Sequence, residues 1–159
     1  MQSHPKTQQL DSIDKAILRE LQADGRISNL DLSQRVGLSA SACLRRVKQL
    51  EEGGSIAGYT ALLNQRALGL TGTSFTIVNL ESMSNAALEA FERAVQAEPR
   101  IQDCYYVAGP NDYLIRFLYR DGDDLERFHT EVLMRLPNVA RSNSILVLRT
   151  VKKTTAIEV

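Results

Sequence analysis

The first third of the chain carries hydrophobic residues at the spacing of one helix face. The first such set begins after Asp11, a residue type that commonly caps helices, and ends before Gly25. Its members are Ile13, Ile17, Leu18 and Leu21. This spacing predicts a helix that buries one side against other elements.

Residues 28–52 predict two further helices, joined by a short turn at residues 37–39. Ser28 is a good N-cap for the first, and Asp31 three positions later resembles a capping box. Gly37 can adopt the left-handed conformation that ends a helix, and Ser39 can cap the next one. Two helices about a short glycine-containing turn are typical of a DNA-binding helix-turn-helix, and the first helix completes a three-helix unit.

The second helix of this motif has an apolar face and a basic face. At about 100° per residue, the apolar stripe contains Cys43, Val47 and Leu50, with Leu44 on its flank. Arg46 lies between the two faces, where a long side chain can reach a phosphate. Most amphipathic helices have a solvated polar face, so the basic face is informative only because it follows the capped turn. The candidate DNA-binding residues are Ser39, Ser41, Arg45, Arg46, Lys48 and Gln49.

After Gly54 the pattern changes to strands and helices in alternation. Strand-like residues 56–63 and a connector rich in glycine and threonine predict a linker strand and hinge over 55–73. The elements predicted beyond it are a strand at 74–80, a helix at 85–97, strands at 101–108 and 113–119, a helix at 123–136 and a strand at 142–151. This βαββαβ order predicts a ferredoxin-like antiparallel sheet with both helices on one face.

The predicted fold class is therefore α+β, with two domains. A winged-type or three-helix helix-turn-helix domain occupies 10–54, a ferredoxin-like domain occupies 74–152, and 153–159 form a C-terminal tail. Because its strands carry large apolar residues on both sides, the sheet needs a second cover. This predicts a homodimer, sheet against sheet, whose two recognition helices can read major grooves roughly 34 Å apart.

Composition reduces the number of function classes that fit the chain but does not identify one. The 159 residues carry no net charge, so any affinity for DNA depends on local charge placement. Cys43 and Cys104 lack metal or redox spacing and are expected to pack as small apolar groups, and His4 and His129 have no partner at zinc spacing. Neither a membrane span of roughly 20 apolar residues nor a secretory signal is recognisable, which predicts no membrane partner and a cytoplasmic, nucleoid-associated protein.

Two separate stretches resemble the Lrp/AsnC family of bacterial and archaeal regulators, also called feast/famine regulatory proteins. One runs from I-D-K-A-I-L at residue 13 to K-Q-L-E at residue 51, followed by I-A-G-Y; the other is C-Y-Y-V-A-G-P-N-D-Y-L-I-R-F at 104–117. The resemblance covers about 10–152 and implies a helix-turn-helix, an effector-binding and oligomerisation domain, and dimers that often form octamers. The chain departs from the family at Ala40 and Ala42, where prolines are frequent, and at Ser55, where an apolar residue is usual.

The resemblance also implies an effector site for an amino acid or a related small molecule. In the family a G-x-x-D-Y turn lies near the effector pocket between dimers, and Asp112 is the residue of most interest in it. Free backbone groups beside a carboxylate can hold both ends of an amino acid, whereas without the resemblance Gly-Pro-Asn-Asp indicates a simple tight turn between strands. The candidate effector residues are Gly109, Asn111, Asp112 and Tyr113 in the turn, with Ser142 and Ser144 flanking the pocket.

These observations favour a sequence-specific regulator of transcription that binds double-stranded DNA, acts on genes of amino-acid metabolism or transport, and responds to an amino acid. A nucleoid-organising protein that wraps DNA with little sequence preference needs the same helix and is the alternative. An enzyme is not expected, because the sequence shows no nucleophile paired with a base and no metal-ligand cluster. No cofactor is predicted, because no cofactor motif is present.

Overall fold

The computed structural model describes residues 9–159, which divide into two compact units. The first unit contains the residues up to Leu62 together with Lys152–Val159, and the second is Leu63–Val151. The polar leader with His4 lies outside the described residues. The first unit is therefore assembled from two separate stretches of the chain.

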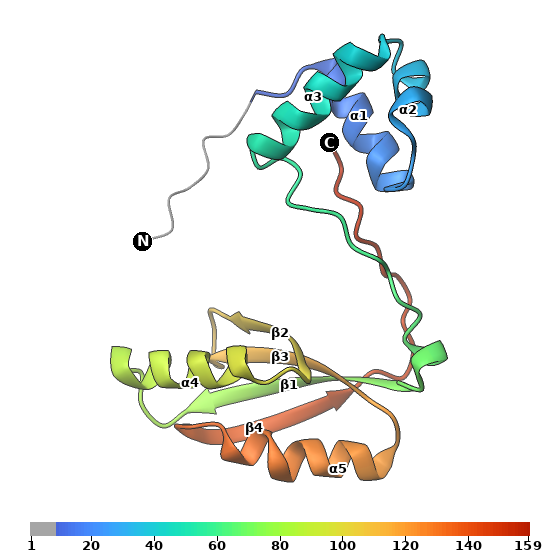
Figure 1. Ribbon diagram of the computed structural model, residues 1–159. Helices are drawn as coiled ribbons and strands as arrows, with labels where there is room; N and C mark the ends of the chain where they lie inside the picture. The colour runs from blue at the N-terminus through green and yellow to red at the C-terminus, as the bar shows by residue number, and fades with distance from the viewer. Residues whose placement is uncertain (1–8) are drawn as a thin grey trace. The chain divides into compact units, whose positions relative to one another are not determined.

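Three helices form the first unit (Figure 1), and all three were predicted from the sequence. They are α1 Ser12–Ala23, α2 Asn29–Arg35 and α3 Ala40–Glu52. The Asp11 carboxylate caps α1 by accepting hydrogen bonds from the N–H groups of Ile13 and Asp14. Leu44, predicted on the flank of the apolar stripe, is 46% exposed. The core of the unit contains Ile17, Leu18, Leu32, Cys43 and Leu50.

The turn between α2 and α3 forms as predicted. Gly37 has a φ of +69°, the left-handed conformation that ends α2. Ser39 Oγ accepts a hydrogen bond from the Ala42 N–H at 3.2 Å and caps α3. At the start of α2, Ser28 Oγ accepts from the Asp31 N–H at 3.1 Å, but the Asp31 carboxylate accepts from the Ser28 hydroxyl. The predicted capping box at this end is thus only half formed.

The second unit is a four-stranded antiparallel sheet with two helices on one face (Figure 1), which confirms the ferredoxin-like prediction. Its elements are β1 Gly72–Leu80, α4 Asn85–Ala97, β2 Ile101–Tyr106, β3 Tyr113–Tyr119, α5 Gly122–Glu131 and β4 Val139–Leu146. The strand order is β2-β3-β1-β4, so β1 pairs with both β3 and β4. Alternate residues of β1 and β3 are buried beneath the helices, where the rings of Phe117 and Phe128 stack at 3.7 Å.

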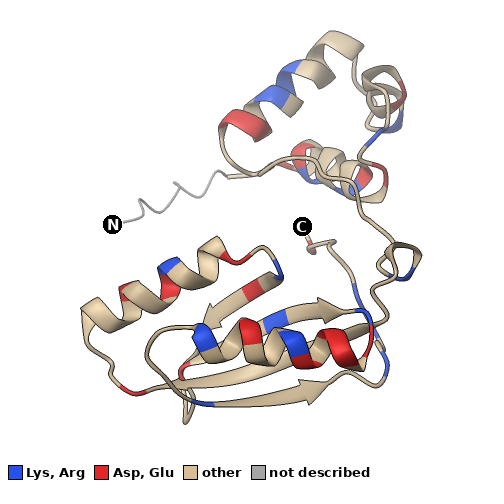
Figure 2. Cartoon of the chain, turned by 60° about the horizontal axis from the view of Figure 1, so that its bottom comes forward, with Lys and Arg blue, Asp and Glu red and all other residues tan. Residues whose placement is uncertain are grey.

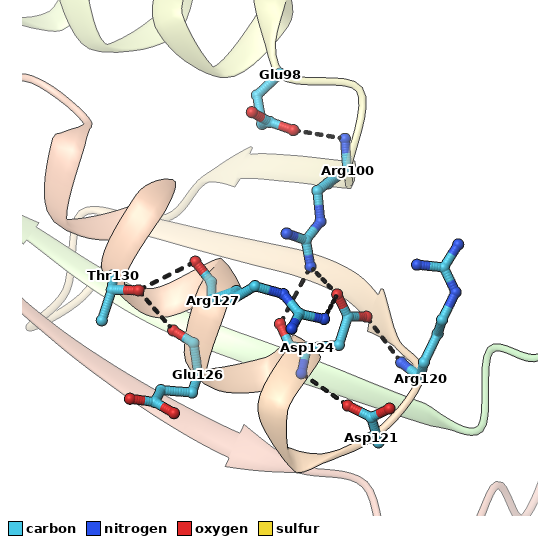
Figure 3. Close-up of polar contacts among 8 residues, drawn as sticks. All are labelled: Glu98, Arg100, Arg120, Asp121, Asp124, Glu126, Arg127 and Thr130. Atoms are coloured by element: carbon cyan, nitrogen blue, oxygen red, sulfur yellow. Dashed lines mark hydrogen bonds and ion pairs between the residues drawn. The ribbon is translucent and has the colours of Figure 1, made fainter.

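A buried carboxylate joins three elements of this unit. Asp124, which is only 5% exposed, lies in the first turn of α5. Its carboxylate accepts hydrogen bonds from the Arg120 N–H at 2.9 Å and from Arg100 Nη2 at 2.9 Å (Figure 3). The Arg120 N–H chiefly, and then the positive charge of Arg100, hold the pKa of Asp124 below its ordinary value. Asp124 therefore links α5 to the end of β3 and to the residue before β2.

Several predicted boundaries are wrong. Residues 56–63, all of them described, form no strand, and the Ile56 N–H bonds the Leu50 carbonyl oxygen at 3.0 Å. The last strand begins at Val139 and ends at Leu146, where its register places it against β1, and only the Val147 N–H continues the pairing, with the Thr73 carbonyl oxygen at 3.0 Å. The strand predicted at 101–108 ends at Tyr106.

The helix predicted over 123–136 is also too long. It ends at Glu131, where Val132 leaves helical geometry with φ −112° and ψ −69°. A short 3-10 turn, Leu133–Arg135, follows. This change of path keeps both Leu133 and Leu136 buried in the core of the second unit.

Neither α4 nor α5 covers the opposite face of the sheet. The strand register places on that face six apolar side chains, which are half-buried or exposed: Phe75, Ile77, Tyr105, Leu114, Leu118 and Ile145. Arg116 and Asp103 form an ion pair among them. We call this surface the open sheet face.

Candidate nucleic-acid interface and ligand site

The exposed basic side chains of α3 form no ion pair with other described residues. Arg45, Lys48 and Gln49 are exposed, on the side opposite the buried Cys43 and Leu50. Within residues 9–159, neither Arg45 nor Lys48 pairs with a carboxylate. Figure 2 shows that the basic residues lie in the middle of α3 and the acidic residues at its C-terminal end. Arg45 and Lys48 can therefore approach an anionic surface without first breaking an ion pair.

The N-terminal end of α3 presents two serines. Ser39 and Ser41 are exposed, and their hydroxyl oxygens lie 3.3 Å apart. The preceding helix supports this end, because Asn29 Nδ2 donates to the Ala40 carbonyl oxygen at 2.8 Å. Asn29 is not among the predicted site residues, and its position directly after the Ser28 cap is the only signal for it in the sequence.

Arg46 is not available in the way the sequence suggested. Its guanidinium donates to Asp11 Oδ2 at 2.8 Å and to Asp14 Oδ1 at 2.7 Å, and its side chain is 25% exposed. Hydrogen bonds to Asp14 and Asp11 raise the pKa of Arg46, while the Asp14 N–H first, and then Arg46, lower the pKa of Asp11. In this structure Arg46 fastens α3 to the capped start of α1, where a phosphate would have to compete with two carboxylates.

The predicted effector turn closes the end of β1. Asp112 N–H donates to the Val78 carbonyl oxygen at 3.1 Å, and its carboxylate accepts from the Leu80 N–H at 2.8 Å. Gly109 has a φ of +134°, which favours glycine at this point of the turn. One Asp112 oxygen is thus occupied by the main chain, while Gly109 is exposed and Asn111 half-buried.

Tyr113 belongs to the core of the unit. It is 2% exposed, and its hydroxyl donates to Glu92 Oε1 at 2.7 Å. Its ring lies 4.6 Å from that of Phe91 and 5.1 Å from that of Tyr106, centre to centre. Burial, with the neighbouring Glu92, raises the pKa of Tyr113. Both its ring and its hydroxyl contact other core residues, and its role in holding a ligand stays a prediction.

The two predicted serines on β4 lie in different surroundings. Ser142 is exposed and pairs across the sheet with Val78, the residue that also binds Asp112. Ser144 lies two residues further along β4, its Oγ 2.7 Å from Thr76 Oγ1 and 3.1 Å from His129 Nε2. The structure therefore brings Ser142 and the turn to the same end of β1, and places Ser144 beside α5.

Two residues that the sequence analysis missed also lie at this end of β1. Asn79 Nδ2 donates to the Pro110 carbonyl oxygen of the turn at 3.1 Å. Arg141 Nη2 donates to Asn79 Oδ1 at 3.3 Å. The pairing of β1 with β3 brings Asn79 to the turn, and its pairing with β4 brings Arg141; the sequence alone did not contain either register.

The remaining reactive side chains form no recognisable site in the described part of the chain. Cys43 is buried in the core of the first unit, and burial raises the pKa of Cys104 to about 11. Over residues 9–159, no three His, Cys, Asp or Glu side chains are grouped so as to hold a metal ion. Nor does any helix in this range have the length and apolar character needed to cross a membrane.

Two models of known protein families match the chain. The AsnC-type helix-turn-helix domain matches residues 10–51, and the Lrp/AsnC ligand binding domain matches residues 73–157. The first match falls in the three-helix unit, and the second covers most of the unit that contains the sheet.

Individual relatives match over almost the whole chain. The leucine-responsive regulatory protein of Rhizobium meliloti is 42% identical over 151 residues, which cover 95% of this chain and 97% of that protein. The leucine-responsive regulatory protein of Escherichia coli is 44% identical over 144 residues, which cover 91% and 88%. A crystal structure of the transcriptional regulator NMB0573 from Neisseria meningitidis in complex with L-Met has a TM-score of 0.89 and 36% identity, covering 94% and 96%.

Proposed function

The chain belongs to the Lrp/AsnC family of transcriptional regulators, and from this premise we propose that α3 reads operator DNA under the control of an amino acid or related effector. The observation that carries the proposal is the basic face of α3, where Arg45 and Lys48 pair with no carboxylate among residues 9–159 and which follows a capped glycine turn. Arg45, Lys48 and Gln49 are the residues proposed to meet DNA, with Ser39 and Ser41 at the helix start. Arg46 is proposed to position α3 rather than to contact DNA.

Binding to the protein's own upstream promoter tests this proposal. Fluorescence anisotropy should show a Kd that weakens steeply as salt rises, since phosphate contacts release counterions. Arg45→Ala should cost about 1–3 kcal/mol if that side chain contacts a base edge. Equal affinity for a random duplex would remove the claim of sequence specificity and leave a DNA-wrapping role, which the family matches do not favour.

The effector is proposed to bind at the end of β1. The carbonyl oxygens of Gly109 and Asn111 and the second oxygen of Asp112 can accept hydrogen bonds from an ammonium group, and the Arg141 guanidinium can donate to a carboxylate. Ser142 follows Arg141 on β4, so its side chain points to the other face of the sheet. Support comes from the ligand-binding family model and from the relative solved with L-Met. Because the surface is open on a single chain, we propose that another copy completes the pocket.

A thermal-shift screen of the twenty amino acids tests this site. At least one should raise Tm at millimolar concentration, because a ligand that binds only the folded state stabilises it. Arg141→Ala should abolish that rise, whereas Arg149→Ala, an exposed arginine beyond the end of β4, should keep it. If no amino acid shifts Tm, the effector belongs to another chemical class.

Self-association is the third part of the proposal. The open sheet face exposes Tyr105 and Ile145 by 53% and 49%, and it carries four further apolar side chains. A contiguous apolar patch of this kind is typical of an interface. We propose that two copies pack sheet against sheet, so that two α3 helices bind one DNA molecule; assembly into an octamer rests on the family resemblance. A cytoplasmic location follows from DNA as the partner.

A further inference from the structure

The end of the chain lies on α1, within the first unit. The Gln22 side chain binds the main chain of Ile157 twice: its Oε1 accepts from the Ile157 N–H at 2.6 Å, and its Nε2 donates to the Ile157 carbonyl oxygen at 2.9 Å. Three residues earlier on α1, Arg19 Nη2 donates to the Val159 main-chain oxygen at 2.6 Å. Two side chains on one face of α1 thus hold alternate residues of a segment that is not helical.

An apolar contact accompanies these hydrogen bonds. Val159 packs against the core cluster that contains Ile17 and Leu18, whereas the Ile157 side chain is 73% exposed. Ile157 is therefore held through its main chain, and Val159 through both its main chain and its side chain. Main-chain hydrogen bonds combined with an apolar anchor are the means by which protein surfaces bind peptide segments.

This segment returns to the first unit after the second unit has been completed. The second unit ends at Val151, and Lys152–Val159 belong to the first. The unit that carries α3 is consequently joined to the ligand-binding unit by two chain connections, one before β1 and one after β4. The chain that leaves β4 thus leads to the segment that is hydrogen-bonded to α1.

We propose that Arg19 and Gln22 form a docking surface on α1 whose occupant is the C-terminal segment 155–159 of this chain. The docked segment is a strap that stiffens the three-helix unit, and its release loosens α1. The strap requires neither DNA nor an effector, so its test does not depend on the proposed function.

Hydrogen exchange over residues 12–23 tests the strap in the full chain. Gln22→Glu keeps an acceptor for the Ile157 N–H but sets a second carboxylate oxygen against the Ile157 carbonyl oxygen. Its α1 amides should therefore exchange faster, and the first unit should melt about 4–8 °C lower, a shift of ordinary size for a small domain. The control is Lys15→Ala, an exposed cation one turn earlier on the same helix, which should change neither quantity.

A second experiment supplies the segment separately. A chain ending at Val151 should show the same fast exchange in α1, and a synthetic peptide of residues 152–159 should slow it again. The same peptide with Ile157→Pro should not, because proline lacks the N–H that Gln22 accepts. Unchanged exchange in both Gln22→Glu and the shortened chain would overturn the proposal, as would equal action of the two peptides.

Discussion

Arg45 and Arg46 are neighbours in the sequence with opposite surroundings. Arg45 is exposed and faces away from the core, whereas Arg46 bonds two carboxylates at the start of α1. We expect Arg46→Ala to lower Tm, because it unfastens α3 from α1 and leaves Asp14, 14% exposed, without its cation. Arg45→Ala should leave Tm unchanged and weaken DNA binding.

Thermal melting and anisotropy on both variants check this division of roles. For Arg46→Ala, any loss of DNA affinity should accompany the loss of stability and diminish at temperatures far below Tm. A stable Arg46→Ala protein with a large loss of affinity would instead place Arg46 on the DNA.

Asp124 makes stability depend on pH. Its pKa is lowered in the folded chain, so its contribution is complete above the ordinary value of 3.8 and is lost as the pH falls through the folded pKa. Asp124→Asn should cost about 3 kcal/mol near neutral pH, since it leaves Arg100 without its buried partner. The difference from the natural chain should shrink below about pH 3.8.

Urea unfolding at several pH values measures that difference. Asp123→Asn is the matched control, because Asp123 lies in the same first turn of α5 but is exposed. It should change the free energy of unfolding little at any pH. A difference for Asp124→Asn that stays constant down to pH 3 would show that the carboxylate charge does not stabilise the fold.

Among the elements, the turn between α2 and α3 gives the sharpest prediction. Gly37 has a φ of +69°, and no atom lies within 4 Å of where a Cβ would be. Gly37→Ala should therefore destabilise through backbone strain alone, by about 1 kcal/mol. Gly122→Ala, at the first position of α5 with equally open space and no positive φ, should be neutral or slightly stabilising.

Chemical unfolding of the two glycine variants separates the conformational cost from the cost of an added methyl group. Equal destabilisation at both sites would contradict the assignment of the cost to the left-handed turn. The free energy of unfolding of Gly37→Asn should lie between those of the natural chain and of Gly37→Ala, because asparagine tolerates this conformation better than alanine.

The sequence predicts an element correctly where the residues of that element alone determine it. Caps such as Asp11 and Ser39 and the periodicity of α4 lie in a few consecutive residues, and they placed those helices correctly. The extent of β4 depends on its register with β1, and residues 56–63 have strand-like composition but no partner strand in the described chain. Strand formation requires a neighbour that the local pattern does not contain.

The same distinction between local and tertiary causes applies to the residues of the candidate site. The exposed face of α3 followed from helical geometry, since each residue's direction is set by its position. The ion pair of Arg46 with α1, the burial of Tyr113 and the approach of Arg141 to the turn all arise from tertiary packing. Family resemblance located the turn, and only the fold distinguished its exposed residues from its buried ones.

At the scale of the whole molecule, the open sheet face decides how many α3 helices meet DNA together. In a symmetric dimer each substitution occurs twice in the interface, so one charge placed there brings two like charges together. Ile145→Lys should weaken self-association by about 3 kcal/mol, a hundredfold in Kd. The folded chain itself should tolerate the change, because Ile145 is already 49% exposed.

Sedimentation velocity over a range of concentrations measures this, with Met134→Lys as the matched control. Met134 is 77% exposed and lies in the 3-10 turn after α5, not on a strand. Only Ile145→Lys should shift the chain to a smaller species, and its DNA affinity should fall because the two helices no longer bind as one unit. If both variants sediment like the natural chain, the copies associate through another surface and the apolar residues of the open sheet face serve a different contact.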